Sequence, residues 1–197
     1  MIDELKSITM VEKIIKEESN FTIKSKNEFD KCIKHLFQLI TAAYTLYMSE
    51  AFPSSVFLSI TVIEEVAKIH MGIYAKSSDT YVKKDKLRDH KTTEIIGANC
   101  TIYMSERIKK AIDTEKLETI FKLAYSGKLK ELREKSIYCE CKDGKIVIPH
   151  DIINKEFSKN MLLFAIESFD DNLVGYTNYS MDISKKTDIL FDKVANI

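Results

Sequence analysis

The sequence is poor in the residues that break regular structure: it has five glycines, two prolines and no tryptophan among 197 residues. Sheet-rich folds use glycine and proline in their many turns, so this shortage favours an all-α fold. Ten phenylalanines and nine tyrosines supply aromatic bulk instead of tryptophan. A hydrophobic content of 45% is normal for a globular protein, and the length predicts one domain over residues 1–197.

The chain also lacks net charge, because 30 lysines and arginines balance 30 acidic residues. A passive nucleic-acid coat protein is usually basic, which disfavours that class. The charge is unevenly spread, however: residues 83–145 hold 16 Lys/Arg against 11 Asp/Glu, a surplus of five. This distribution is compatible with a local basic surface on a neutral protein.

Signals for metal binding, secretion and membrane insertion are missing as well. The start of the chain has no apolar core of signal-peptide length, and the longest apolar run is interrupted by Glu64 and Glu65. We therefore expect a reduced, cytoplasmic, soluble protein with no membrane partner, no cofactor and no metal. The four cysteines stand at spacings that match no metal-binding pattern: Cys32, Cys100, Cys139 and Cys141.

Apolar residues recur at helical spacing along most of the chain. Phe52-Pro53-Ser54-Ser55 reads as a stop and restart between two long helices, because proline suits a first helical turn and serine suits a cap. Asp143-Gly144 is a hairpin turn signal and predicts a short two-stranded excursion over residues 137–148. The predicted helices cover residues 1–18, 28–51, 54–75, 85–105, 114–135 with Gly127 as a break point, 150–169 or beyond, and 184–194.

The stretch VIEEVAKIH places two carboxylates and a lysine inside the most apolar helix. Glu64 and Lys68 are four residues apart, on one helical face and in the favourable order for an ion pair. Because an unpaired buried carboxylate is costly, partners are expected, first Lys68 and then the basic residues of the motif RDHK. A buried ion-pair network that fixes helix register and a catalytic pocket both fit this pattern.

Three motifs resemble the AbiV family of bacterial abortive-infection proteins. They are IEEVAK at residues 63–68, the pair His90-Lys91, and Arg133 to Pro149 in the pattern RE-x-x-IY-x-x-x-x-DG-x-I-x-x-P. The resemblance covers most of the chain, in the same order and with similar spacing. It implies a helical bundle of the HEPN class, a class that often forms dimers and often cleaves RNA without a metal.

The resemblance also implies which residues carry the chemistry. We predict His90, Glu65 and Arg133 as catalytic residues. The usual HEPN signature, an arginine followed four to six residues later by histidine, is missing here, because Tyr138 stands at that distance from Arg133. The residues predicted to bind phosphate or to orient the catalytic groups are Glu64, Lys68, Lys91, Arg88 and Tyr138.

Two functions remain open at this point. The first is an effector that arrests phage-infected cells as a metal-independent RNase and stops translation once a phage component triggers it. The second is a non-catalytic module that sequesters a phage or host translation factor. We expect a homodimer, in which the opening helix, residues 1–20, is either peripheral or part of the dimer interface.

Overall fold

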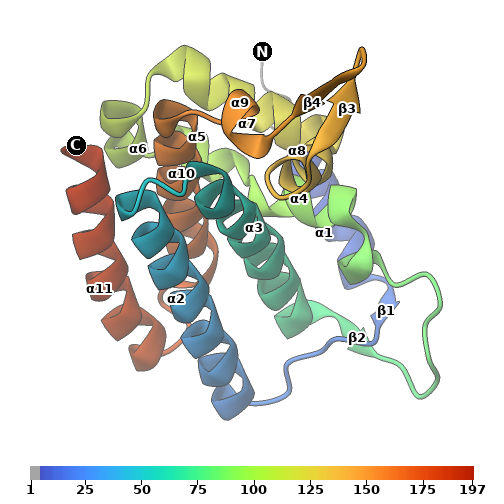
Figure 1. The fold of residues 1–197 in the computed structure, drawn as a ribbon. Coiled ribbons are helices and arrows are strands. Elements are labelled where there is room, and N and C mark those ends of the chain that lie inside the picture. The colour runs from blue at the N-terminus through green and yellow to red at the C-terminus, as the bar shows by residue number, and fades with distance from the viewer. Residues whose placement is uncertain (1–4) are drawn as a thin grey trace.

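The computed structural model describes residues 5–197, apart from the side chains of Leu5 and Cys100. Four long helices form the centre of the bundle (Figure 1): α2 (Lys26–Met48), α3 (Phe52–Tyr74), α10 (Lys155–Leu173) and α11 (Asn178–Ala195). Helix α3 packs against α2 and α10, and α11 closes the other side by packing against α2 and α10. The predicted all-α bundle is confirmed.

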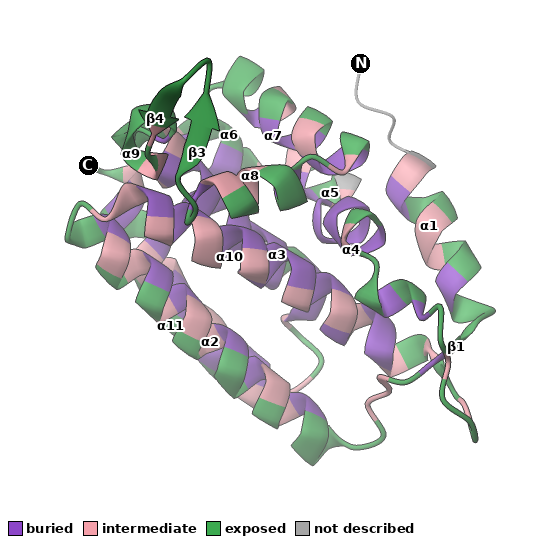
Figure 2. Ribbon diagram, turned by 45° about the vertical axis from the view of Figure 1, so that its right-hand side comes forward, coloured by how far each residue is buried: buried purple, intermediate pink, exposed green. Residues whose placement is uncertain are grey.

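The burial pattern explains why α3 and α10 occupy the centre. Helix α3 is apolar on nearly every face, and Figure 2 shows α3 and α10 largely buried, whereas α2 and α11 are buried along one stripe. A helix that is hydrophobic all round requires neighbours on all sides. Within the described residues, no helix is both long enough and apolar enough to cross a membrane.

A layer of shorter helices covers the face of α3 that points away from α11. Helix α4 packs on α3, and α1, α7 and α8 pack around α4. The shorter elements are α1 (Leu5–Ile15), η1 (Lys86–Arg88), α4 (His90–Gly97), α5 (Cys100–Met104), α6 (Glu106–Ala111), α7 (Thr114–Ser126), α8 (Leu129–Lys135) and α9 (Pro149–Ile152).

The predicted hairpin is confirmed: β3 (Glu140–Lys142) and β4 (Lys145–Val147) pair antiparallel around Asp143-Gly144, whose φ angles are both positive. The hairpin projects from the bundle directly after α8 (Figure 1). A second pair, β1 (Glu18–Ser19) and β2 (Lys76–Ser77), is parallel and was not predicted. Strands of two residues carry too little periodicity to be recognised in a sequence.

Several predicted helix boundaries were wrong, because side-chain caps start new helices inside apparently continuous patterns. The single helix predicted for residues 85–105 is divided where the Asp89 side chain accepts a hydrogen bond from Thr92 N and starts α4. Asn154 caps α10 and separates it from α9. Thr177 caps α11, which therefore begins at Asn178 rather than Ser184. The predicted break at Gly127 is confirmed, and the expectation of helix at residues 1–4 lies outside the described residues.

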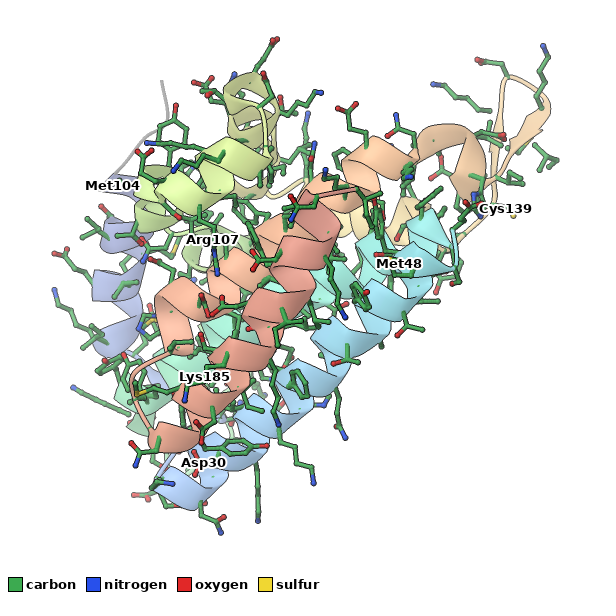
Figure 3. All side chains as sticks on the ribbon, turned by 90° about the vertical axis from the view of Figure 1, so that its left-hand side faces the viewer. Asp30, Met48, Met104, Arg107, Cys139 and Lys185 are labelled. Carbon is green, nitrogen blue, oxygen red and sulfur yellow. The ribbon has the colours of Figure 1, made fainter. Side chains whose placement is uncertain are left out.

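An arginine cluster fastens α6 to the central bundle. Arg107 donates to Glu167 Oε2 and Asp170 Oδ2 of α10, each at 2.8 Å, and to Asp188 of α11. Its guanidinium also lies 4.3 Å from the ring centroid of Phe191 on α11. Figure 3 shows Arg107 directed from α6 toward the two long helices. One side chain thus ties three helices together.

The close approach of α4 to α3 depends on Gly97. A Cβ atom at this position would lie 2.4 Å from the carbonyl oxygen of Ile63, which is backbone and cannot rotate away. On its other side, the Gly97 carbonyl accepts a hydrogen bond of 2.7 Å from Ser168 of α10. The missing side chain therefore allows α4 to rest directly on α3, one residue before Glu64.

We expect Gly97→Ala to lower the free energy of unfolding by about 1–3 kcal/mol, because added volume in a packed interface forces backbone to shift. Urea denaturation of the two proteins measures this difference. Gly72→Ala is the matched control, since a Cβ there meets the side chain of Phe21, which can turn away. Equal losses at both positions would contradict the proposed role of the α3–α4 contact.

Candidate functional site

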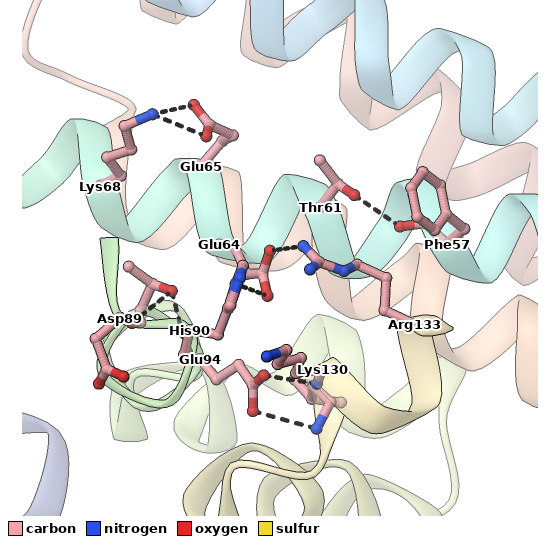
Figure 4. A network of polar contacts seen from close by, with 12 residues as sticks. Phe57, Thr61, Glu64, Glu65, Lys68, Asp89, His90, Glu94, Lys130 and Arg133 are labelled. Carbon is pink, nitrogen blue, oxygen red and sulfur yellow. Dashed lines mark hydrogen bonds and ion pairs between the residues drawn. The ribbon is translucent and has the colours of Figure 1, made fainter. Parts of the chain in front are cut away.

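Glu64 joins side chains from three helices at the surface between α3, α4 and α8 (Figure 4). Its Oε1 lies 3.0 Å from His90 Nδ1 on α4, and its Oε2 accepts a hydrogen bond from Arg133 Nη1 on α8. The residue is only 7% exposed. The carboxylate therefore lies between a histidine and an arginine that are 26 and 69 residues further along the chain.

His90 is the first residue of α4, and its side chain keeps 39% of its surface exposed. The Asp89 cap fixes this helix start and so fixes the direction of the imidazole. Within residues 5–197, no hydrogen bond occupies the second ring nitrogen, Nε2. A carboxylate on Nδ1 with Nε2 left available is the arrangement that orients a histidine for proton transfer.

A cavity of about 280 Å³ opens beside His90. Leu87 gives it an apolar wall, and charged groups of both signs surround the rest. The volume is large enough to admit part of a nucleotide. Its lining residues are Glu64, Glu65, Lys68, Leu87, Arg88, His90 and Thr93.

Burial shifts the ionisation of both partners in the Glu64–His90 pair. It raises the pKa of Glu64 to about 7, although the Arg133 charge opposes the rise. Burial also lowers the pKa of His90, and the charges of Arg133 and Lys130 lower it further. At neutral pH the imidazole is therefore mostly unprotonated and able to accept a proton.

The predicted pairing of Glu64 with Lys68 is wrong. Lys68 pairs with Glu65 at 3.1 Å, while Glu64 contacts His90 and Arg133. Figure 4 shows the side chains of the two glutamates leaving α3 in different directions. The helical spacing allows Lys68 to pair with either glutamate. It pairs with Glu65, because Glu64 contacts His90 of α4 and Arg133 of α8 instead. Glu65 lines the cavity without making the contacts that we expected of a catalytic residue.

The other predicted residues divide into two groups. Arg88 lines the cavity, with its Nη1 donating to the Tyr81 hydroxyl at 2.7 Å. The stem of Lys91 packs over Gly127, at the turn between α7 and α8. Tyr138 is 63% exposed at the base of the hairpin, after α8 has ended. Of these three residues, Arg88 lines the cavity, whereas Lys91 and Tyr138 are not among its lining residues.

Sequence reasoning missed two residues, Glu94 and Lys130. Glu94 is fully buried one turn after His90, and its carboxylate accepts hydrogen bonds from the backbone N–H groups of Leu129 and Lys130. The charge of Lys130 acts on both Glu64 and His90. The available signal was that Glu94 lies on the same helical face as His90, four residues on.

Burial raises the pKa of Glu94 from 4.5 to about 7, against the opposing effect of its two backbone hydrogen bonds. A folded-state pKa above the unfolded value means that the folded protein binds the proton more tightly. The associated stability is fully present below pH 4.5 and is lost as the pH rises through about 7.

We therefore expect the stability of the wild type, relative to Glu94→Gln, to fall between pH 5 and pH 8 by on the order of 2–3 kcal/mol. Glutamine has a similar size and does not titrate, so the comparison cancels the contributions of groups far from Glu94. Urea denaturation of both proteins at the two pH values measures the difference. A difference that is constant or that grows with pH would contradict this prediction.

Comparison with known proteins supplies one match. The family model HEPN_AbiV, described as AbiV, matches residues 24–169, a span that contains α2, α3, α4, α8 and all three members of the cluster. No curated protein and no solved structure matches the chain. Because the matched span is most of the sequence, and because the fold is the all-α bundle that the resemblance implied, the chain belongs to the AbiV family of HEPN proteins.

Proposed function

We propose that this abortive-infection family member is a metal-independent endoribonuclease whose active centre is the Glu64–His90–Arg133 cluster. The observation that carries the proposal is the contact between the buried Glu64 carboxylate and His90 Nδ1, made by an imidazole that is 39% exposed and lines the cavity. The family itself points to abortive-infection defence. RNA as the substrate and its cleavage as the activity go beyond what the family match indicates and belong to this proposal.

The chemistry requires only groups within or beside the cluster. His90 Nε2 takes the proton of an RNA 2′-hydroxyl, and the 2′-oxygen forms a bond to the adjacent phosphorus. The bond from phosphorus to the 5′-oxygen breaks, and the imidazolium returns its proton to that oxygen. The products are a 2′,3′-cyclic phosphate and a 5′-hydroxyl. Glu64 holds the ring in position and stabilises its charged form.

Cations around the cluster stabilise the charge that develops on the phosphate. Arg133 contacts Glu64 through Nη1, and its remaining guanidinium N–H groups suit a phosphate oxygen. Lys130 adds a second positive charge near His90. In this proposal Lys68 and Arg88, which line the cavity, contact the flanking RNA.

The setting that we propose is the bacterial cytoplasm, with the activity silent until a phage component appears. A constitutive RNase would damage its own host, so a trigger is needed. We also propose that the protein acts as a homodimer, as HEPN proteins often do. The neutral net charge fits an enzyme that does not bind RNA indiscriminately.

The competing function is a non-catalytic module that sequesters a phage or host translation factor. One observation favours it: the Arg133 side chain is only 18% exposed and is already paired with Glu64. A network that is satisfied internally can serve structure alone. The two functions predict different fates for cellular RNA.

The test compares bacteria that express the wild type with bacteria that express His90→Ala at equal abundance, before and after phage infection. We expect cleaved RNA with 2′,3′-cyclic phosphate ends in the wild type and at least a ~100-fold loss of cleavage in the variant, the usual contribution of an acid–base group. His35→Ala changes an exposed histidine on α2 and serves as the control. Growth arrest with intact RNA would refute the nuclease and support sequestration.

A further inference from the structure

We infer that Glu94 is a positioning residue, which fixes helix α8 to helix α4 and thereby places Arg133 and Lys130 beside the Glu64–His90 pair. The inference rests on the proposed function for its catalytic consequence, but the placement itself can be measured without any activity. Glu94 belongs to none of the motifs that identified the site in the sequence.

The contacts of Glu94 are made to backbone. Its Oε1 accepts from Lys130 N at 2.6 Å and its Oε2 accepts from Leu129 N at 3.1 Å, at the first two residues of α8. Both N–H groups belong to the start of the helix, where intrahelical partners are lacking. Because these bonds hold main chain rather than mobile side chains, they fix the position of α8 as a unit.

Helix α4 therefore carries both His90, which contacts Glu64, and Glu94, which binds the start of α8. His90 and Glu94 are one turn apart, so the imidazole faces Glu64 of α3 while the carboxylate faces the start of α8. A second contact supports this attachment: the stem of Lys91 lies over Gly127, which ends α7 in the left-handed conformation. Helix α4 thus contacts the turn at Gly127, which connects α7 to α8.

Position along α8 determines where its cations point. Lys130 is the second residue of the helix, and Arg133 follows one turn after Leu129. Arg133 reaches Glu64, and the charges of Arg133 and Lys130 both act on His90. Helix α8 has only seven residues and buries Leu129, so the hydrogen bonds at its start act together with this packing to set where these cations lie.

A carboxylate is needed here because both acceptors are used. Glutamine at this position would offer one acceptor oxygen, and its amide group would meet the second N–H as another donor. Burial of this carboxylate also raises its pKa, so its ionised form costs stability. A group retained at such a cost fits a role in arranging the site better than a role in holding the fold.

The test uses NMR spectroscopy of the full chain and measures the pKa of His90 from its ring protons in the wild type, Glu94→Gln and Glu131→Gln. Glu131 is an exposed glutamate on α8 and gives the matched control. In Glu94→Gln, we expect the pKa of His90 to rise toward its usual value as the two cations move away. Amide exchange at Leu129 and Lys130 should become at least ~10-fold faster. Glu131→Gln should resemble the wild type in both measurements.

The proposal is overturned if Glu94→Gln is folded and leaves the pKa of His90 unchanged, because Glu94 would then serve only stability. Should Glu94→Gln fail to fold, Glu94→Asp replaces it: the shorter side chain keeps its charge but cannot reach both N–H groups, so the same rise in the pKa of His90 is expected. A wild type that cleaves no RNA would refute the proposed nuclease but not the placement, which the histidine titration decides separately.

Discussion

Replacing Glu64 by alanine is expected to lower the free energy of unfolding by about 3–5 kcal/mol at pH 5 and by less at pH 8, because burial raises the pKa of Glu64 to about 7 and so disfavours its ionised form in the folded protein. The change removes the only buried member of the cluster and leaves the guanidinium of Arg133, whose side chain is 18% exposed, without its partner. A buried charge that loses its counter-charge costs far more than the pair contributes when intact. Urea denaturation followed by circular dichroism measures the loss.

Glu65→Ala provides the matched control, one residue away in the same helix. Glu65 and its partner Lys68 are 28% and 29% exposed, so this pair is accessible to solvent and its removal should cost less than about 1 kcal/mol. Similar losses for the two variants would show that Glu64 is not the centre of a buried network.

A double-mutant cycle of Glu64 and Arg133 sharpens the same prediction. If the two side chains stabilise each other, the double alanine variant loses less stability than the sum of the single variants. Additive losses would contradict a coupled pair.

Arg107→Ala is expected to reduce stability by a similar amount, about 3–5 kcal/mol at pH 8. Arg107 neutralises Glu167, Asp170 and Asp188, which would otherwise repel one another between α10 and α11. The change also removes the contact with the Phe191 ring. Thermal and urea denaturation both measure the effect, and α6 should lose its attachment to the bundle first.

The pH dependence of this loss identifies its cause. Burial raises the pKa of Asp170, while Arg107 opposes that rise, so removing Arg107 raises the pKa further. The uncompensated carboxylates then take up protons as the pH falls, and the penalty should be smaller at pH 4 than at pH 8. Lys185→Ala, which breaks an exposed pair with Asp182, serves as the control. A pH-independent penalty would indicate lost packing rather than unpaired charge.

The sequence allowed the bundle to be predicted because apolar periodicity and the scarcity of glycine and proline act locally. The long helices α2 and α3, the interruption at Gly127 and the hairpin at Asp143-Gly144 all follow from signals within a few residues. Helix boundaries were less predictable where polar caps such as Asp89 and Asn154 look like ordinary surface residues in a helical pattern.

Sequence patterns drew attention to Glu64, His90 and Arg133, which the structure brings together, but not to their pairings. Periodicity placed Glu64 on a buried face and indicated that it needs a partner. It could not show that the partner is Arg133 rather than Lys68, because that choice depends on how α8 docks. Glu94 could not be predicted because its contacts also depend on how α8 docks, and its partners are backbone N–H groups, which every residue except proline has.

The separation of the cluster along the chain has a consequence for synthesis on the ribosome. Glu64 is made first, His90 follows 26 residues later and Arg133 follows after 69. Helix α10, which packs along α3, is made later still. An emerging chain therefore cannot assemble the three side chains until α8 has left the exit tunnel. Until then, the emerging chain lacks the arrangement that we propose to attack RNA, so the messenger and ribosome that produce it are not exposed to this activity.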